Sequence, residues 1–253
     1  MATSRLTPVH GLQVYRTITR FSAFASGMPQ YILFHKPYGV LSQFTPEDGA
    51  RSLAEFGLPQ GVYPAGRLDK DSEGLLLLTD DGPLIEQLLN PRNEKPKTYW
   101  ALVERVPDAI ALQRMRDGLR IEDYTTRPCQ VKLLDPQPVV EPRDPPVRTR
   151  KSVQDVWLEI QVIEGKNRQV RKMTAAIGHP TLRLIRRQIA NLELADLPPG
   201  QWRAIQREDI QWDAPAARSA HRPAAGMRTP RSPVGNAPAA GHRKPGTWFN
   251  KKN

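Results

Sequence analysis

The sequence has very little cysteine: Cys129 is the only one among 253 residues. A single thiol excludes an internal disulfide and a cysteine-rich zinc site, and it favours a reducing compartment, so we expect a soluble cytoplasmic protein. The sequence also has no uninterrupted apolar run of about 18 residues, so we expect no transmembrane helix and no membrane partner. The 5 histidines are scattered along the chain, and no spacing predicts a metal site.

Motifs that hold nucleotides or activate serine are also missing. The chain contains neither a GxGxxG stretch nor a P-loop, so a nucleotide cofactor has no anchor and we predict no cofactor. It contains no GxSxG stretch either, which excludes that form of serine nucleophile. Any reaction must therefore use carboxylate, cationic and aromatic side chains.

Acidic residues are absent from both ends of the chain. Residues 1–29 carry +3 and residues 214–253 carry +8, and together they account for the whole net charge of +11. Both ends lack apolar periodicity, so we expect a disordered basic leader and a disordered basic tail around a domain at 30–213. The true start is open between Met1 and Met28. Basic arms favour polyanions such as nucleic acid, although a purely solubilising tail is the alternative.

The central part of the chain mixes strand and helix patterns. Short apolar or alternating runs predict strands at 30–37, 74–79, 97–104, 155–165 and 181–189. Apolar residues at helical spacing, with Pro83, Pro107 and Gly178 near the ends, predict helices at 82–90, 107–119 and 167–178. The proline-dense segment 135–152 is expected to be an exposed insertion. This pattern predicts an α+β fold with a largely antiparallel sheet and flanking helices.

The stretch "AGRLDKDSEGLLLLTDDG" at residues 65–82 places many charges in front of a buried strand. Asp69 at the strand mouth would be held rigidly and partly desolvated, as a nucleophile or general base requires. An ordinary turn aspartate is the alternative for any single Asp. We expect Asp71 and Glu73 to be solvated residues that shape the turn.

A second charged stretch, "EGKNRQVRKM" at residues 164–173, follows a predicted strand. Arg168, Arg171 and Lys172 lie at helical spacings of three and four, so they share a broad basic face suited to phosphate contacts. A solvated helix face is the alternative. Lys166 lies at the strand-to-helix turn, where a fixed cation could pair with a buried carboxylate.

The aromatic pair in "KPKTYWALVE" lies within a predicted strand. Tyr99 and Trp100 are adjacent, so their side chains point to opposite faces of the sheet. One ring can fill the core while the other faces a site and stacks on a base. Two core-filling aromatics are the alternative.

Together these motifs resemble the RsuA/RluB/RluE/RluF family of pseudouridine synthases. The resemblance rests on "GRLDKDSEGLLLLTDDG", "KTYWALV", "EGKNRQVRKM" and "TLRLIRRQI", which occur in the family's order over roughly residues 30–212. It implies a pseudouridine synthase fold with a central active-site cleft. RluE-type members, to which "FHKPYGVLSQFT" and the "RDPPVRTRKS" insertion are similar, lack the S4 RNA-binding domain of other members, and we expect none here.

The resemblance implies an isomerase that breaks the glycosidic bond of a flipped-out uridine and rejoins the base through C5. It identifies Asp69 as the nucleophile and Lys166 as the cation that pairs with it and keeps it ionised. Tyr99 would stack on the uracil and move a proton, and Leu184 would line the uracil pocket. Arg67, beside the nucleophile, would help to fill the gap left by the flipped base and hold a phosphate.

The expected partner is 23S ribosomal RNA or the pre-ribosomal large subunit, with a monomeric enzyme. By resemblance to RluE-type members the target is uridine 2457. Another rRNA or tRNA site, or a non-catalytic RNA-binding assembly factor, is the alternative. A glycoside hydrolase that pairs Asp69 with Asp80 or Asp81 is a further alternative from another class.

Overall fold

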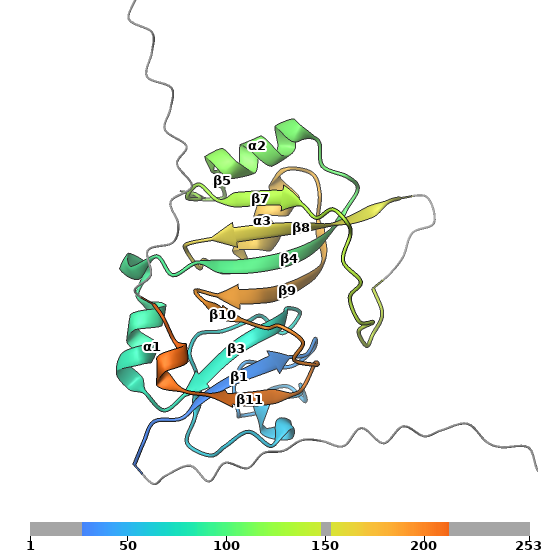
Figure 1. Ribbon diagram of the computed structural model, residues 1–253. Helices are drawn as coiled ribbons and strands as arrows, with labels where there is room; N and C mark the ends of the chain where they lie inside the picture. The colour runs from blue at the N-terminus through green and yellow to red at the C-terminus, as the bar shows by residue number, and fades with distance from the viewer. Residues whose placement is uncertain (1–26, 148–152, 213–253) are drawn as a thin grey trace, which may run out of the picture. The chain divides into compact units, whose positions relative to one another are not determined.

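The computed structural model describes residues 27–147 and 153–212 (Figure 1). The expected basic tail, nearly all of the expected leader and residues 148–152 of the insertion lie outside the described residues. No helix in the described part is long and apolar enough to span a bilayer.

One sheet organises the described chain. Its nine strands are β1 (Tyr31–Lys36), β2 (Tyr63–Pro64), β3 (Glu73–Thr79), β4 (Lys97–Glu104), β7 (Gln130–Leu133), β8 (Asp155–Val162), β9 (Thr181–Ile189), β10 (Leu192–Glu193) and β11 (Trp202–Ile205). The main order is β11-β1-β3-β9-β4-β8-β7, while β2 pairs with β3 and β10 with β9. All neighbours are antiparallel except β3 and β9, which confirms the predicted α+β class. A separate hairpin joins β5 (Arg120–Ile121) and β6 (Tyr124–Thr125).

Three α-helices and three short 3₁₀ turns complete the part of the chain that the structure describes. They are α1 (Gly82–Leu89), α2 (Ala109–Asp117), α3 (Gln169–Ala176), η1 (Leu53–Phe56), η2 (Pro91–Asn93) and η3 (Arg207–Asp209). The three predicted helices are confirmed with shorter bounds. Asp81 and Asp108 cap α1 and α2 by accepting backbone N–H bonds at 3.0 and 2.7 Å. Gly178 follows α3 in the left-handed conformation, as its predicted capping role requires.

The strands β1 and β3 are buried on both faces. Leu75 and Leu77 of β3 pack into one apolar cluster with α1, whereas Leu76 and Leu78 pack into another with η1 and residues near it. This two-sided burial explains why residues 74–79 are continuously apolar instead of alternating.

The other half of the sheet is covered by α2 and α3, as Figure 1 shows. Inward-facing residues of β4, β7, β8 and β9 join both helices in one apolar cluster, which includes Met115 and Met173. The predicted face of β8 is confirmed, since its members are all buried: Val156, Leu158, Ile160 and Val162.

The two halves join where β3 runs parallel to β9. Their register covers only Glu73 opposite Ile185 and Gly74 opposite Arg186. Gly74 has φ +106°, and a Cβ at this position would lie 2.3 Å from the carbonyl oxygen of Arg186. Only glycine permits this approach. Because the parallel pairing is so short, β3 and β9 diverge beyond it (Figure 1).

A buried ion pair crosses this junction. Arg183 Nε and Nη2 donate to the two carboxylate oxygens of Glu73 at 2.9 and 2.8 Å, and the side chains are only 6% and 2% exposed. Arg183 also donates to the carbonyl of Glu141 in the proline-rich insertion. The prediction that Glu73 is a solvated turn residue is therefore wrong. Its side chain points into the junction, where the guanidinium compensates its charge.

We predict that Glu73→Gln lowers the free energy of unfolding by about 3–5 kcal/mol, because it leaves the buried Arg183 charge uncompensated. Urea denaturation of the full chain measures this loss. Glu55→Gln is the matched control, since Glu55 pairs with Arg51 where the side chains are 44% and 58% exposed, and it should leave the urea midpoint nearly unchanged. Equal small losses would show that the buried pair does not hold the two halves together.

Candidate active site

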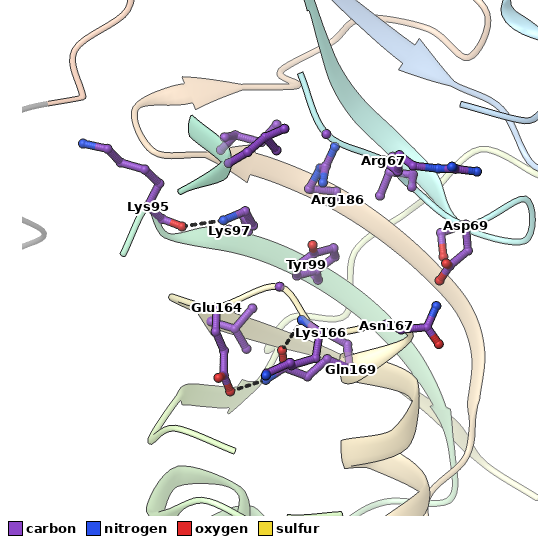
Figure 2. A pocket seen from close by; sticks show the side chains of 18 of the residues that line it. Arg67, Asp69, Lys95, Lys97, Tyr99, Glu164, Lys166, Asn167, Gln169 and Arg186 are labelled. Atoms are coloured by element: carbon purple, nitrogen blue, oxygen red, sulfur yellow. Dashed lines mark hydrogen bonds between the residues drawn. The ribbon is translucent and has the colours of Figure 1, made fainter. Parts of the chain in front are cut away.

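A pocket of about 790 Å³ opens beside the β3–β9 junction (Figure 2). Its walls come from the loop before β3, from the end of α1 and the link to β4, from β4 and β9, and from the turn between β8 and α3. The charged and aromatic residues that line it are Arg67, Asp69, Lys70, Glu94, Lys95, Lys97, Tyr99, Glu164, Lys166, Arg168 and Arg186. Segments far apart in sequence therefore meet at one site.

Asp69 lies in the turn between β2 and β3, with its side chain 33% exposed. The Asp69 carbonyl accepts from the N–H of Ser72 at 3.0 Å, which closes the turn. On the other side, Ser42 Oγ donates to the Leu68 carbonyl and accepts from the Leu68 N–H, at 2.8 and 3.0 Å. These bonds fix the backbone on both sides of Asp69, so its carboxylate reaches the pocket from a rigid turn.

Lys36, at the end of β1, also holds the same turn in place. Its ammonium group is fully buried and donates to the carbonyls of Val40 and Pro37 at 2.6 and 3.0 Å. A longer contact of 3.5 Å reaches the carbonyl of Lys70. Burial lowers the pKa of Lys36 to about 7, although the nearby carboxylates, led by Glu73, oppose this shift. The lysine thus connects β1 to the segment that carries Asp69.

Two arginines at the start of α3 hold the other side of the turn. Arg168 binds both carboxylate oxygens of Asp71 at 2.9 Å and lies 3.7 Å from Asp69. Arg171 Nη2 donates to the Asp71 carbonyl at 2.6 Å. Burial raises the pKa of Asp71, but the Arg168 hydrogen bond and the Arg171 charge outweigh it, so the pKa is lowered overall. Asp71 therefore shapes the turn as predicted, but through ion pairs.

The expected pairing of Lys166 with Asp69 is not formed. The Lys166 ammonium lies 5.5 Å from the centre of the Tyr124 ring, and its backbone N–H donates to Gln169 Oε1 (Figure 2). Arg168 takes the place beside Asp69 because its left-handed backbone, at φ +50°, lets the side chain reach back to the turn. Sequence spacing alone does not reveal this, since it depends on how the chain enters α3.

The strand β4 presents Tyr99 to the pocket. Tyr99 packs against the α2–α3 cluster and lines the pocket, whereas Trp100 packs into the cluster on the opposite face. The predicted division of the two aromatic residues between faces is therefore confirmed. Leu184 of β9 is buried and also lines the pocket. An aromatic and an aliphatic side chain thus provide an apolar wall beside Asp69.

The remaining predicted contacts divide into two groups. Arg67 is exposed at the pocket wall. Arg171 is committed to the Asp71 turn, and Lys172 binds Glu122 at 2.9 Å, outside the pocket lining. The expected broad phosphate-binding face of α3 is therefore divided among intramolecular partners, and only Arg168 of the three lines the pocket.

Among the pocket residues that sequence reasoning missed, Lys97 and Arg186 lie on strands that carry predicted site residues. Each lies two positions from a predicted site residue on the same strand, Lys97 from Tyr99 and Arg186 from Leu184. Since alternate strand residues share a face, that spacing was the available signal.

The carboxylate pair of a glycoside hydrolase is not assembled. Asp69 lies before β3, whereas Asp80 and Asp81 follow it, and neither lines the pocket. Seven strand residues span about 23 Å at roughly 3.3 Å per residue, far beyond the roughly 5–9.5 Å between the carboxylates of such enzymes. Within the described ranges, no three His, Cys, Asp or Glu side chains form a group that could hold a metal ion.

Comparison with known proteins gives a consistent picture. Residues 30–176 match the model of the RNA pseudouridylate synthase family. A protein of Xanthomonas campestris named ribosomal large subunit pseudouridine synthase E is 59% identical over 174 residues, which cover 68% of this chain and 93% of that protein. The protein of the same name from Vibrio parahaemolyticus is 49% identical, over 69% of this chain and 73% of its own length.

A solved structure described as a pseudouridylate synthase has the same fold. It superposes with a TM-score of 0.60 and 25% sequence identity, and the match covers 72% of each chain.

We predict that raising the pH increases the unfolding free energy of the wild type more than that of Lys36→Met. Between pH of about 7 and 10.5, the unfolded chain holds a proton on Lys36 that the folded chain has released, so pH increase favours the folded state. The difference should grow by up to about 1.4 kcal/mol per pH unit. Urea denaturation from pH 6 to about 9.5 measures it.

The control is Lys132→Met, since Lys132 is 65% exposed. Its stability curve should run parallel to that of the wild type. Parallel curves for Lys36→Met as well would mean that Lys36 keeps its ordinary pKa.

Proposed function

The chain belongs to the RNA pseudouridylate synthase family and is an RNA pseudouridine synthase, an isomerase; from this premise we propose that it converts one uridine of large-subunit ribosomal RNA to pseudouridine, with Asp69 as the nucleophile. The observation that carries the choice of RNA is the 59% identity to a relative named for the large ribosomal subunit. The observation that supports Asp69 is its position in the pocket, beside a cation and an aromatic ring.

The pocket supplies a role for each side chain. Asp69 attacks the flipped-out uridine, and the Arg168 guanidinium at 3.7 Å orients the carboxylate. Tyr99 stacks on the uracil and transfers a proton, and Leu184 closes the apolar wall. Arg67, at the exposed rim, contacts the phosphate of the displaced nucleotide.

Lys166 was expected to pair with Asp69; we propose instead that it contacts the substrate. It is exposed and lines the same pocket, so its charge is available to RNA. Arg171 and Lys172 support the site through the Asp71 turn and the β5–β6 hairpin, and they contribute positive charge near the RNA.

The finer assignments rest on the resemblance to RluE-type sequences. We propose uridine 2457 of 23S rRNA as the target, with free rRNA or the pre-ribosomal particle as substrate and a monomeric enzyme in the cytoplasm. We also propose residues 30–213 as the catalytic domain. The acid-free segments at 1–29 and 214–253 would add phosphate contacts.

We predict that Asp69→Asn abolishes conversion, because the amide cannot act as the nucleophile. Unmodified large-subunit rRNA carrying tritium at uracil C5 is incubated with the protein. Released tritium is counted, and the product is located by carbodiimide-stop primer extension. Wild type should release tritium and give one stop, at uridine 2457.

Asp80→Asn is the matched control, because Asp80 is an exposed carboxylate at the other end of β3; it should retain activity. A stop elsewhere would reassign the target. Tight binding without tritium release by the wild type would favour a non-catalytic RNA-binding factor.

We further predict that Arg168→Met slows the single-turnover reaction at least about tenfold more than Lys166→Met does, a difference of about 1.4 kcal/mol in the barrier. The reason is that Arg168 alone contacts Asp69 among the described cations. Arg168→Lys should recover part of the rate because it keeps a charge, although not the two bonds to Asp71. If Lys166→Met were slower than Arg168→Met, Lys166 would be the cation that acts with Asp69.

A further inference from the structure

The pocket continues beyond the residues that the proposed reaction uses. In Figure 2, Asp69 and Arg67 lie toward one end, Tyr99 lies in the middle, and Lys97 lies on the far side of Tyr99. Arg186 also lines the pocket, and the β4–β9 register places it directly opposite Tyr99. Two cations therefore flank the position at which a base would stack on Tyr99.

Arg186 is buried but incompletely bonded. The residue is 4% exposed, and its Nε donates to the Leu75 carbonyl of β3 at 2.8 Å. Its Nη2 is buried and has no hydrogen-bond partner among the described residues. An unpaired buried donor costs free energy, so a donor left unpaired in a pocket indicates a ligand that accepts its hydrogen bond.

Lys97 brings a second cation to the same place. Its ammonium donates to the Lys95 carbonyl at 2.9 Å, which leaves further donors free for a ligand. Burial lowers its pKa to about 8, and the Arg186 charge contributes to the same shift. Lys95, in contrast, turns away, because its ammonium donates to the Trp212 carbonyl at 2.6 Å.

The nearby carboxylates do not neutralise this pair. Glu94 pairs with Arg127 at 2.6 Å, and Glu164 accepts from the backbone N–H of Arg127 and from Gln169. Neither forms an ion pair with Lys97 or Arg186 within the described residues. A buried and a half-buried cation that lie close together without a carboxylate partner favour a ligand that brings negative charge.

We propose that Lys97 and Arg186 bind the carbonyl oxygens of the target uracil and stabilise the negative charge that these oxygens gain during isomerisation. This inference rests on the proposed function, since it assigns two further residues to the same reaction. Lys97 and Arg186 would act as an oxyanion hole built from side chains on β4 and β9.

The electron balance places charge on these oxygens by either route. If Asp69 attacks ribose C1′, the C1′–N1 bond breaks and its electron pair stays on the uracil, spread over N1, O2 and O4. If Asp69 instead adds to uracil C6, the C5=C6 electron pair moves toward O4 as an enolate. In the first route that pair then forms the C5–C1′ bond and Asp69 leaves C1′. In the second route the C1′–N1 bond breaks with its pair on N1, the enolate pair forms the C5–C1′ bond, and loss of the C5 proton expels Asp69 from C6. In both routes C5 loses a proton and N1 gains one. The role of the two cations is therefore independent of which atom Asp69 attacks.

A phosphate group of the RNA could also accept hydrogen bonds from these two cations, but the burial of Arg186 disfavours a phosphate here. Arg67 and Arg168 are exposed and stand at the pocket mouth, where the backbone of a flipped nucleotide stays. Arg186 is reached only from within the pocket, because it is 4% exposed. The base is the part of a flipped nucleotide that penetrates deepest.

The experiment compares Lys97→Met and Arg186→Lys with the wild type on the rRNA site mapped by primer extension. Single-turnover rate constants and RNA dissociation constants are measured for each full-length variant, after thermal unfolding has shown that it is folded. We expect Lys97→Met to slow the reaction roughly 10²-fold, the usual cost of removing one such donor, with RNA affinity changed less than about threefold.

Arg187→Lys is the matched control, because Arg187 neighbours Arg186 but stacks on Trp100, 4.5 Å from its ring centre, on the opposite face. It should react at the wild-type rate. A wild-type rate for Lys97→Met, or a loss confined to affinity with a weaker salt dependence, overturns the inference and indicates a phosphate contact. No turnover by the wild type itself would overturn the proposed function instead.

A second measurement identifies the oxygen. RNA carrying 4-thiouridine or 2-thiouridine at the target replaces O4 or O2 with sulfur, a weaker hydrogen-bond acceptor. The sulfur should slow the wild type more than it slows Lys97→Met or Arg186→Lys, because those variants have already lost the contact. Equal slowing of wild type and both variants by both thio-substrates would overturn the inference.

Discussion

The short parallel contact between β3 and β9 is the constraint on which the site depends. It requires Gly74, whose missing side chain lets β3 approach the Arg186 backbone. It is reinforced by the buried Glu73–Arg183 pair. Because the contact is only two residues long, the sheet opens beyond it. Asp69 enters from one side of that opening, and Tyr99, Leu184 and the β8–α3 turn form the rest of the pocket.

Burial and ion pairing separate the charged residues at this site into structural and reactive groups. Asp71 and Glu73 hold arginines and fix the backbone, so they are unavailable for chemistry. Lys36 is buried against the turn, and within the described residues its hydrogen bonds go to backbone carbonyls. Asp69 remains partly exposed to the pocket beside Arg168. One stretch of sequence thus contains structural and reactive carboxylates that look alike until their partners are known.

The elements and the position of the reactive turn were predictable from local pattern. The continuous apolar run at 74–79, the alternation in β8 and the capped helical segments each encode one element, and the structure has all of them. The division of Tyr99 and Trp100 between faces follows from strand geometry alone. The partners of charged residues were not predictable: Glu73 is buried with Arg183, and Arg168 rather than Lys166 meets Asp69. These pairs join residues about 100 positions apart, so no local spacing reports them.

By itself the sequence determined the α+β class, the strands and helices, and the motifs that resemble pseudouridine synthases, because periodicity, capping and motif spacing are local properties of a chain. Only the tertiary structure decided which cation stands beside Asp69 and which carboxylates are structural. It also decided that Lys97 and Arg186 face one pocket, on two strands joined by antiparallel pairing. The physical reason is that side-chain charge acts over a few ångströms in space, and the chain folds distant segments to that separation.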